Sequence, residues 1–205
     1  MIKVRVLLII AFCSFINACS SLPSEKNTPL NNLDSYQERQ AKIAQLNQWK
    51  LTGKIAFLEG KKRESANIYW QYFPKTQTQQ LTLTTYLGIQ VFSLTSLDGL
   101  HTLTLDGKSY TDTNLSRLLD SFTGYPLPAT QLTQWLFGLA ANKSDQVHFA
   151  QDKKLPSRLT TESYDSPWQV KYEDYQTINT LFLANKLTIK HQNLTIKLLI
   201  SEWTL

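Results

Sequence analysis

Cysteine is nearly absent from this sequence, and its two copies, Cys13 and Cys19, both lie close to the N-terminus. The chain that follows Cys19 therefore has neither a disulfide nor thiolate chemistry. Its fold must be held together by a hydrophobic core alone. About 165 residues are enough to bury such a core.

The sequence also lacks the motifs of the common catalytic and metal centres. His101, His148 and His191 lie far apart without HExxH or His-x-His spacing, so we expect solvent-facing histidines and no metal site. No serine stands in a GxSxG elbow, and GKSYT at 107–111 lacks the leading glycine of a phosphate-binding loop. We therefore expect no catalytic residues, no nucleotide site and no cofactor, and we do not interpret the protein as an enzyme.

Dense positive charge is missing along the sequence as well. The formal net charge is +5, and it becomes +3 when Lys3 and Arg5 are left out. The one basic run that stands out, Lys61-Lys62-Arg63, is smaller than a nucleic-acid footprint requires, so we expect no nucleic-acid partner. The run is either a solvated loop or a candidate docking patch for a charged protein partner.

The N-terminal residues predict an export signal that ends at a cysteine. Lys3 and Arg5 precede an apolar stretch, residues 6–16, that is too short to span a bilayer. The Ile-Asn-Ala-Cys sequence at 16–19 matches a lipobox, which has an aliphatic residue first and a small residue before the cysteine. We expect removal of 1–18 and acylation of Cys19; the alternative is a plain secretory signal followed by an incidental cysteine.

The residues after the expected cleavage point divide into a tether and one domain. Residues 19–33 are polar with two prolines, which is typical of a flexible tether. Ser20 stands where an aspartate tends to retain lipoproteins at the inner membrane, so its presence favours the outer membrane by association. No later stretch has this composition, and we expect a single domain from 34 to 205.

Two-residue periodicity dominates this expected domain. A helix that begins with the capping box of Ser35 and Glu38 is followed by alternating apolar and polar residues from 49 to 111. A change of phase within 88–97 predicts a β-bulge. The pairs Asp98-Gly99 and Asp106-Gly107 predict two-residue hairpin turns. Strands resume after residue 145.

Helical periodicity interrupts the strands in the middle of the chain. The two apolar stripes at i, i+3, i+4 and i+7 are Leu115, Leu118, Leu119, Phe122 and Leu132, Trp135, Leu136, Leu139. Between them, TGYPLP at 123–128 holds Gly124 and two prolines, which would end the first helix.

The order of one helix, about six strands, two helices and four or five strands predicts a mainly β fold. We expect an open antiparallel β-barrel of about 10–11 strands with helices covering its mouth. Side chains of average size do not fill the interior of so large a curled sheet, so an apolar cavity is expected. The five Trp, nine Tyr and nine Phe residues would suit its lining, and they suit an ordinary packed core equally.

One turn is unusual in its composition. LTLTTYLGIQVF at 81–92 reads as two strands joined by a tight turn, with Tyr86 and Leu87 at the tip. Hairpin tips usually carry Asn, Asp or Gly because these positions face water. The apolar pair therefore either packs on its own strands or enters an apolar phase.

Seven segments follow the lipobox in a specific order and spacing. They are WKLTGKIAF (49–57), SANIYWQ (65–71), LTTYLG (83–88), TGYPLP (123–128), LTQWLFGL (132–139), SPWQVKY (166–172) and LTIKLLISEW (194–203). Together they resemble the LolB family, the outer-membrane lipoprotein receptors of the Lol pathway. No single motif is decisive, and Tyr86 stands where family members commonly have proline.

The resemblance implies an open β-barrel tethered to the periplasmic face of the outer membrane. Such a receptor accepts acylated lipoprotein cargo from a LolA-type periplasmic carrier and inserts it into the inner leaflet of the outer membrane. The family's protruding loop carries a leucine needed for membrane delivery, which corresponds here to Leu87 between Tyr86 and Gly88. The partners implied are the carrier, the cargo and outer-membrane lipid, and we expect a monomer.

The family's barrel interior binds acyl chains, and the parity of strand and helix positions predicts which side chains line it here. The predicted lining residues are Trp49, Phe57, Trp70, Leu83, Leu118, Phe122, Trp135 and Leu136. Two other classes fit the same features: the soluble carrier itself, and a lipid-anchored β-barrel module that binds another apolar or envelope ligand. An enzyme is the weakest alternative because no catalytic constellation is present.

Overall fold

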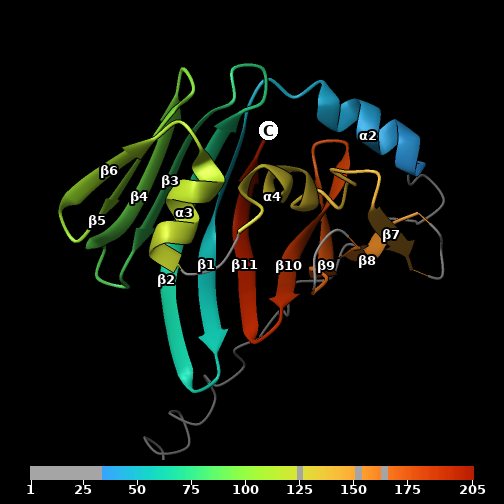
Figure 1. The fold of residues 1–205 in the computed structure, drawn as a ribbon. Helices are drawn as coiled ribbons and strands as arrows, with labels where there is room; N and C mark the ends of the chain where they lie inside the picture. The colour runs from blue at the N-terminus through green and yellow to red at the C-terminus, as the bar shows by residue number, and fades with distance from the viewer. Residues whose placement is uncertain (1–33, 124–126, 151–153, 163–165) are drawn as a thin grey trace, which may run out of the picture. The chain divides into compact units, whose positions relative to one another are not determined.

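The computed structural model describes residues 34–205 except 124–126, 151–153 and 163–165. The expected signal, Cys19, the tether and Gly124 therefore lie outside the described residues. Within them, the structure is one antiparallel sheet with three helices (Figure 1). The expected mainly β class with an open sheet is confirmed.

All eleven strands of the described residues join in the order β6-β5-β4-β3-β2-β1-β11-β10-β9-β8-β7. Strands β6 and β7 are its two ends, so the sheet stays open. The strands are β1 Trp49–Glu59, β2 Lys62–Phe73, β3 Thr78–Thr84, β4 Gln90–Leu97, β5 Leu100–Leu105, β6 Lys108–Asp112, β7 Asp145–Phe149, β8 Pro156–Thr161, β9 Gln169–Ile178, β10 Leu181–His191 and β11 Leu194–Thr204. The helices are α2 Tyr36–Ala44, α3 Leu115–Thr123 and α4 Ala129–Trp135.

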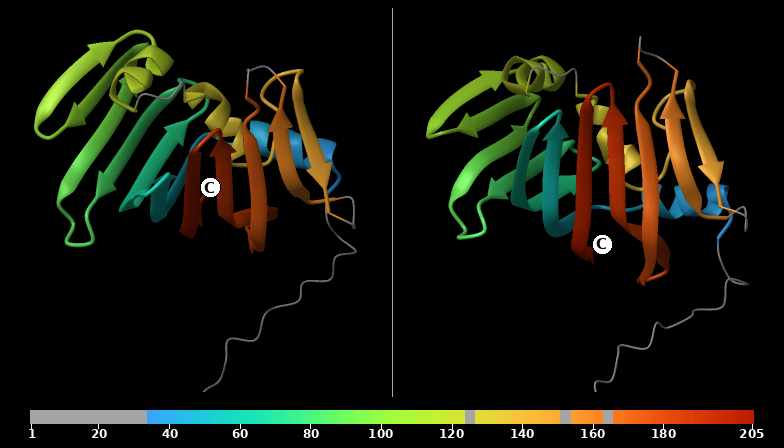
Figure 2. Two further views of the ribbon diagram at one scale, coloured as in Figure 1. Left: turned by 60° about the horizontal axis from the view of Figure 1, so that its bottom comes forward. Right: turned by 90° about the horizontal axis from the view of Figure 1, so that it is seen from below.

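The sheet has an inner face, on which α3 and α4 lie, and an outer face (Figures 1 and 2). Leu51 pairs directly with Trp70 on one side and with Trp203 on the other. Directly paired residues of antiparallel strands point to the same face, so these three belong to the inner face. Lys54 and Lys197 alternate with inner residues and belong to the outer face.

Two apolar clusters fill the space between the inner face and the helices. The first joins β1, β2 and β8–β11 to the residues of α4 and the turn after it, with Leu51, Leu183 and Leu187 fully buried. The second places α3 on Leu94 of β4 and Leu103 of β5. Burial of one such side chain stabilises the fold by about 2 kcal/mol, so the clusters supply the stability that disulfides do not.

Helix α2 begins with the predicted capping box. The Glu38 N–H donates to Ser35 Oγ at 3.3 Å, and the Ser35 N–H donates to Glu38 Oε2 at 2.8 Å. The next residue, Arg39, is buried and donates to the carbonyls of Phe137, at 2.6 Å, and Phe182. Burial lowers the pKa of Arg39, and the neighbouring tyrosines and Asp34 oppose that shift only in part. These bonds fasten α2 to the end of the sheet where β10 begins.

The turns and the bulge predicted from the sequence are confirmed. Leu83 pairs with Phe92 whereas Thr84 pairs with Gln90, so one residue of β4 is extra and its phase changes there. Asp98 and Gly99 both have positive φ, at 50° and 77°, as a two-residue type I′ turn requires. The pair at 106–107 has the same geometry.

The second predicted helix is shorter than its apolar stripe indicated. Helix α4 ends at Trp135, and the next residues form a turn that also packs into the core, which is why Leu136 and Leu139 continue the stripe. Gly138 has φ +69°, and a Cβ there would lie 2.8 Å from the ring of Pro156. The chain therefore leaves the helix where only glycine fits.

The expectation of solvent-facing histidines is wrong for His191. This residue ends β10 on the inner face, is 4% exposed, and stacks on Trp168 with ring centroids 4.3 Å apart. His101 is half-buried and its Nδ1 lies 2.7 Å from Ser96 Oγ, while His148 is exposed. No cluster of His, Cys, Asp and Glu among the described residues could hold a metal ion.

Gly53 provides a test of the close approach between β1 and β11. A Cβ at Gly53 would lie 2.1 Å from the Leu199 carbonyl oxygen, where the pairing of the two strands shifts register. We expect Gly53→Ala to lower the free energy of unfolding by about 3 kcal/mol, since backbone must move. Gly60→Ala is the control: its Cβ meets nothing within 4 Å, and only its positive φ costs about 1 kcal/mol. Urea unfolding followed by tryptophan fluorescence measures both, and equal midpoints would contradict the prediction.

Candidate functional site

The turn between β3 and β4 is closed by its own hydrogen bonds. Thr85 accepts at its carbonyl from the Gly88 N–H at 3.0 Å and from Asn67 Nδ2 at 3.0 Å. Its N–H donates to the Ile89 carbonyl at 2.8 Å, and its hydroxyl accepts from the Ile89 N–H at 3.2 Å. Gly88 has φ +82°, a conformation that favours glycine. These bonds hold the turn in one conformation, so its side chains project from fixed backbone positions.

Three apolar side chains project from this turn into solvent. Tyr86 is 87% exposed, Leu87 is 68% exposed and Ile89 is 61% exposed, and these are the three largest values among the large apolar residues that the structure describes. We call residues 85–89 the apolar tip. Leu87 therefore does not pack on its own strands, and its entry into lipid stays a prediction. Ile89 was not predicted to be part of the tip; the only signal for it in the sequence is its position directly after Gly88.

Half-buried apolar side chains continue from the tip along the inner face. Leu83, Phe92 and Leu105 pair across β3, β4 and β5 in one row, next to the strand ends that form the tip. All three are half-buried, as are Ile55 and Phe57 in the half of β1 that leads to the same end of the sheet. An accessible apolar strip therefore runs from the interior toward the tip.

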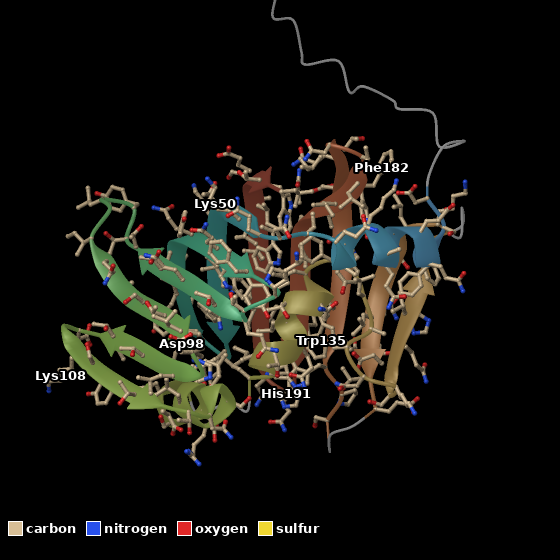
Figure 3. The ribbon with its side chains drawn as sticks, turned by 90° about the horizontal axis from the view of Figure 1, so that it is seen from above. Lys50, Asp98, Lys108, Trp135, Phe182 and His191 are labelled. Atoms are coloured by element: carbon tan, nitrogen blue, oxygen red, sulfur yellow. The ribbon has the colours of Figure 1, made fainter. Side chains whose placement is uncertain are left out.

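The eight predicted lining residues divide into two groups. Trp49, Trp70, Leu118, Trp135 and Leu136 are buried, whereas Phe57, Leu83 and Phe122 are half-buried. Six of the eight meet in the first cluster, and the two from α3, Leu118 and Phe122, lie in the second. Figure 3 shows Trp135 in the crowded interior between helix and sheet. Their contact with acyl chains stays a prediction.

Aromatic rings pack together around Trp49, far from the tip. The Trp49 ring lies 5.1 Å from Trp70 and 5.7 Å from Phe137, both edge-on. A cavity of about 260 Å³ reaches this cluster between α2 and the turn after α4. Apart from this cavity, the end of the interior around Trp49 is packed with aromatic rings, whereas the apolar residues near the tip are half-buried.

Helix α3 is held at its start by polar contacts to β6. Arg117 donates to both carboxylate oxygens of Asp112, with Nε–Oδ2 at 2.7 Å and Nη2–Oδ1 at 2.5 Å. The Asn114 N–H also donates to Asp112, and Asn114 Oδ1 accepts from the Arg117 N–H. The side-chain bond from Arg117, followed by the backbone bond from Asn114, lowers the pKa of Asp112 to about 2.

Within the part of the chain that is described, we find no helix that is both long and apolar enough to cross a membrane.

A family model described as outer membrane lipoprotein LolB matches residues 47–203. The outer-membrane lipoprotein LolB of Shewanella sediminis is 32% identical over 98% of this chain and 87% of its own length. That of Pseudoalteromonas translucida is 30% identical over 94% of this chain and 90% of its own length.

Solved structures of low sequence identity share the fold. A DUF1329 family protein from Desulfovibrio piger aligns with a TM-score of 0.57 at 7% identity, over 81% of this chain and 88% of its own. A LolA superfamily protein from Nitrosomonas europaea aligns with a TM-score of 0.53 at 9% identity, over 84% of this chain and 94% of its own.

These comparisons place the chain in a class of open antiparallel sheets whose inner face is covered by helices. Within that class, the chain belongs to the LolB family, the outer-membrane lipoprotein receptors of the Lol pathway. The family and the outer-membrane location expected from the sequence are confirmed.

The contact of Arg117 with Asp112 can be tested by titration. We expect Arg117→Gln to raise the pKa of Asp112 from about 2 toward the ordinary value of 3.8. A carboxyl whose pKa is depressed by folding stabilises the fold above its unfolded pKa and loses that contribution as the pH falls through the folded pKa. The stabilisation should therefore disappear between pH 3.8 and about 2 in the unsubstituted protein, and be smaller in the variant.

Carboxyl carbon chemical shifts from NMR report the pKa directly. Arg158→Gln, an exposed arginine on β8, serves as the control and should leave the Asp112 titration in place. An unchanged Asp112 titration in Arg117→Gln would assign the low pKa to the backbone contacts alone.

Proposed function

We propose that acyl chains of a lipoprotein cargo enter the inner face of the sheet beside the apolar tip and leave by the same end into the bilayer. One observation carries the proposal: the tip presents Tyr86, Leu87 and Ile89 to solvent at the end of the sheet where inner apolar residues are half-buried. An apolar path from the interior to a lipid surface needs both features at one end.

The tip acts by position and not by anchoring. Burial of one leucine contributes about 2 kcal/mol, which is far less than the acyl chains of a lipoprotein supply at about 0.8 kcal/mol per methylene. Tyr86 suits the interfacial level of a bilayer, where aromatic rings with a polar end settle, and Leu87 reaches deeper. The tip thus brings the apolar strip to the lipid surface and disturbs lipid packing there.

The interior receives chains by exchange of apolar contacts. Phe57, Leu83 and Phe122 are half-buried and form the entry, while Trp49 and Trp135 lie deeper in the packed core. Helix α3 has nine residues and rests on a small cluster separate from the main one, so it is the element that shifts to make room. Apolar contacts have no strict geometry, which suits a site that must both bind and release.

In this proposal transfer runs downhill, since the sequence has no phosphate-binding loop for a nucleotide. A LolA-type carrier holds the cargo less tightly than this receptor, and the membrane holds it more tightly still. Each difference of 1.4 kcal/mol biases a step about tenfold. In this scheme the signal spans 1–18, the acylated Cys19 and a tether to residue 33 hold the protein at the membrane, and the monomeric domain of 34–205 performs the transfer. No step makes or breaks a covalent bond.

Substitution of the tip tests the delivery step. We expect Leu87→Glu to accept labelled lipoprotein from its carrier normally but to deliver it to liposomes at least about tenfold more slowly, because a charged residue does not enter the apolar phase. Leu97→Glu is the matched control: Leu97 is 56% exposed and lies at the opposite end of β4. Equal delivery by the two variants would remove Leu87 from the mechanism.

Substitution of the expected anchor separates localisation from transfer. We expect Cys19→Ala to abolish labelling with radioactive palmitate and to release the protein into the soluble periplasmic fraction. The purified variant should still accept cargo, because the sheet and both apolar clusters lie within residues 34–205. Cys13→Ala is the control and should remain labelled and membrane-bound. Palmitate labelling of Cys19→Ala at the normal level would exclude Cys19 as the acylation site.

A further inference from the structure

The outer face of the sheet carries a group of basic side chains that the transfer of acyl chains does not use. Its six members come from five neighbouring strands and line a groove of about 900 Å³. We call this group the basic face; it consists of Lys54, Arg158, Lys171, Lys186, Lys190 and Lys197. All six side chains are exposed.

Strand register brings these residues together from distant parts of the sequence. Lys197 pairs with Thr188, Thr188 pairs with Lys171, and Lys171 pairs with Arg158, so one row crosses β11, β10, β9 and β8. Paired residues on neighbouring strands lie about 5 Å apart, and residues two apart on one strand lie about 7 Å apart. Neighbouring cations, such as the directly paired Lys171 and Arg158, therefore lie within the screening length of about 8 Å at physiological salt and repel one another.

Charge is segregated onto this face. The groove has a single acidic lining residue, Glu173, which accepts from Lys171 at 3.0 Å and lies 3.6 Å from Lys186. The bond from Lys171 lowers the pKa of Glu173. Six cations and one carboxylate give +5, whereas residues 34–205 as a whole hold 18 basic and 15 acidic side chains, or +3. The rest of the domain therefore carries a net charge of −2, so positive charge is concentrated on the basic face.

The composition of the basic face indicates what covers it. Five of its six cations are lysines and its groove has no aromatic lining residue, whereas protein interfaces are depleted in lysine and enriched in tyrosine, tryptophan and arginine. Clusters of four to eight lysines or arginines near a membrane attract anionic lipid headgroups without a fixed geometry. We propose that the basic face docks on the anionic phospholipids of the bilayer.

The position of the tip fits this docking. Lys54 pairs with Asn67 and Asn67 with Thr84, and the Asn67 side chain donates to the Thr85 carbonyl of the apolar tip. The tip therefore lies about two strand spacings, or roughly 10 Å, from the basic face, and the same bilayer meets both. Helices α3 and α4 lie on the opposite, inner face (Figure 2), so docking of the basic face leaves them clear of the lipid, and the apolar strip meets the bilayer only at its tip end. The inference rests on the proposed function only in placing the domain at a bilayer.

Vesicle binding tests the proposal without carrier or cargo. The protein is residues 19–205 with Cys19→Ala, so that acyl chains do not dominate binding. We expect it to bind vesicles of phosphatidylethanolamine with about 30% phosphatidylglycerol at least about tenfold more tightly than vesicles of phosphatidylethanolamine and phosphatidylcholine. Raising the salt from about 50 mM to about 500 mM should remove that preference.

Two triple variants of equal net charge locate the effect. Lys186→Glu, Lys190→Glu and Lys197→Glu together should abolish the preference for anionic vesicles. The matched control reverses three exposed lysines that lie off the basic face, Lys75, Lys108 and Lys143, and should keep the preference within about twofold. Circular dichroism and thermal unfolding confirm that both are folded. Lys-to-Gln replacements at 186, 190 and 197 provide a milder variant with the same expected direction.

The outcomes separate this inference from the proposed function. Docking by the basic face would be overturned if both triple variants lost the preference for anionic vesicles equally. It would also be overturned if the variant at Lys186, Lys190 and Lys197 kept that preference. Unchanged vesicle binding with slower acceptance of cargo from the carrier would assign the face to an acidic protein and also overturn it. Leu87→Glu in the same assay should weaken binding to neutral and anionic vesicles alike, so a failed tip and a failed basic face give different results.

Discussion

Pairing of the first strand with the last holds the two halves of this sheet together. Strand β1 pairs with β11 from Lys50 opposite Thr204 to Glu59 opposite Leu194, and a register shift beside Gly53 lets the two backbones come close. Without this ladder, β1–β6 and β7–β11 would be two separate sheets. Such non-local pairing must wait for the whole chain, so folding is expected to be slow compared with a helical domain of the same size.

Both candidate surfaces depend on the same ladder. On the inner face it makes the apolar rows continuous, since Leu51 touches β2 on one side and β11 on the other. On the outer face it sets Lys54 of β1 beside the lysines of β11 and β10. An apolar surface and a basic surface thus lie back to back across a single layer of backbone. In our two proposals, that arrangement assigns acyl chains to one face and lipid headgroups to the other.

Local signals in the sequence predicted most of the fold. Alternation marked the strands, Ser35 and Glu38 marked the start of α2, and the Asp-Gly pairs marked turns, because each of these depends on residues close together in the chain. The apolar tip was visible for the same reason. The burial of His191 could not be predicted in this way, because it depends on contact with Trp168, which comes from the loop before another strand. The length of α4 was misread because core packing continued the apolar stripe after the helix had ended.

The basic face escaped sequence analysis for a related physical reason. Its six cations are separated from one another along five strands, and they form no basic run in the sequence like Lys61-Lys62-Arg63. Only the outward parity of Lys186, Lys190 and Lys197 in successive strands hints at it. The depth of each lining residue was equally hidden, since parity assigns a face but does not distinguish the buried Trp70 from the half-buried Leu83.

The unclosed sheet has a mechanical consequence. A closed barrel has a bore fixed by its number of strands and its shear, so widening it means breaking interstrand hydrogen bonds. Here β6 and β7 end the sheet without pairing to each other, and each has only five residues, which limits its use as a template for aggregation. The two margins can hinge apart while every ladder stays intact. For the proposed function, this makes the interior volume adjustable, so that one scaffold would fit cargo whose hydrocarbon tails differ in number and length.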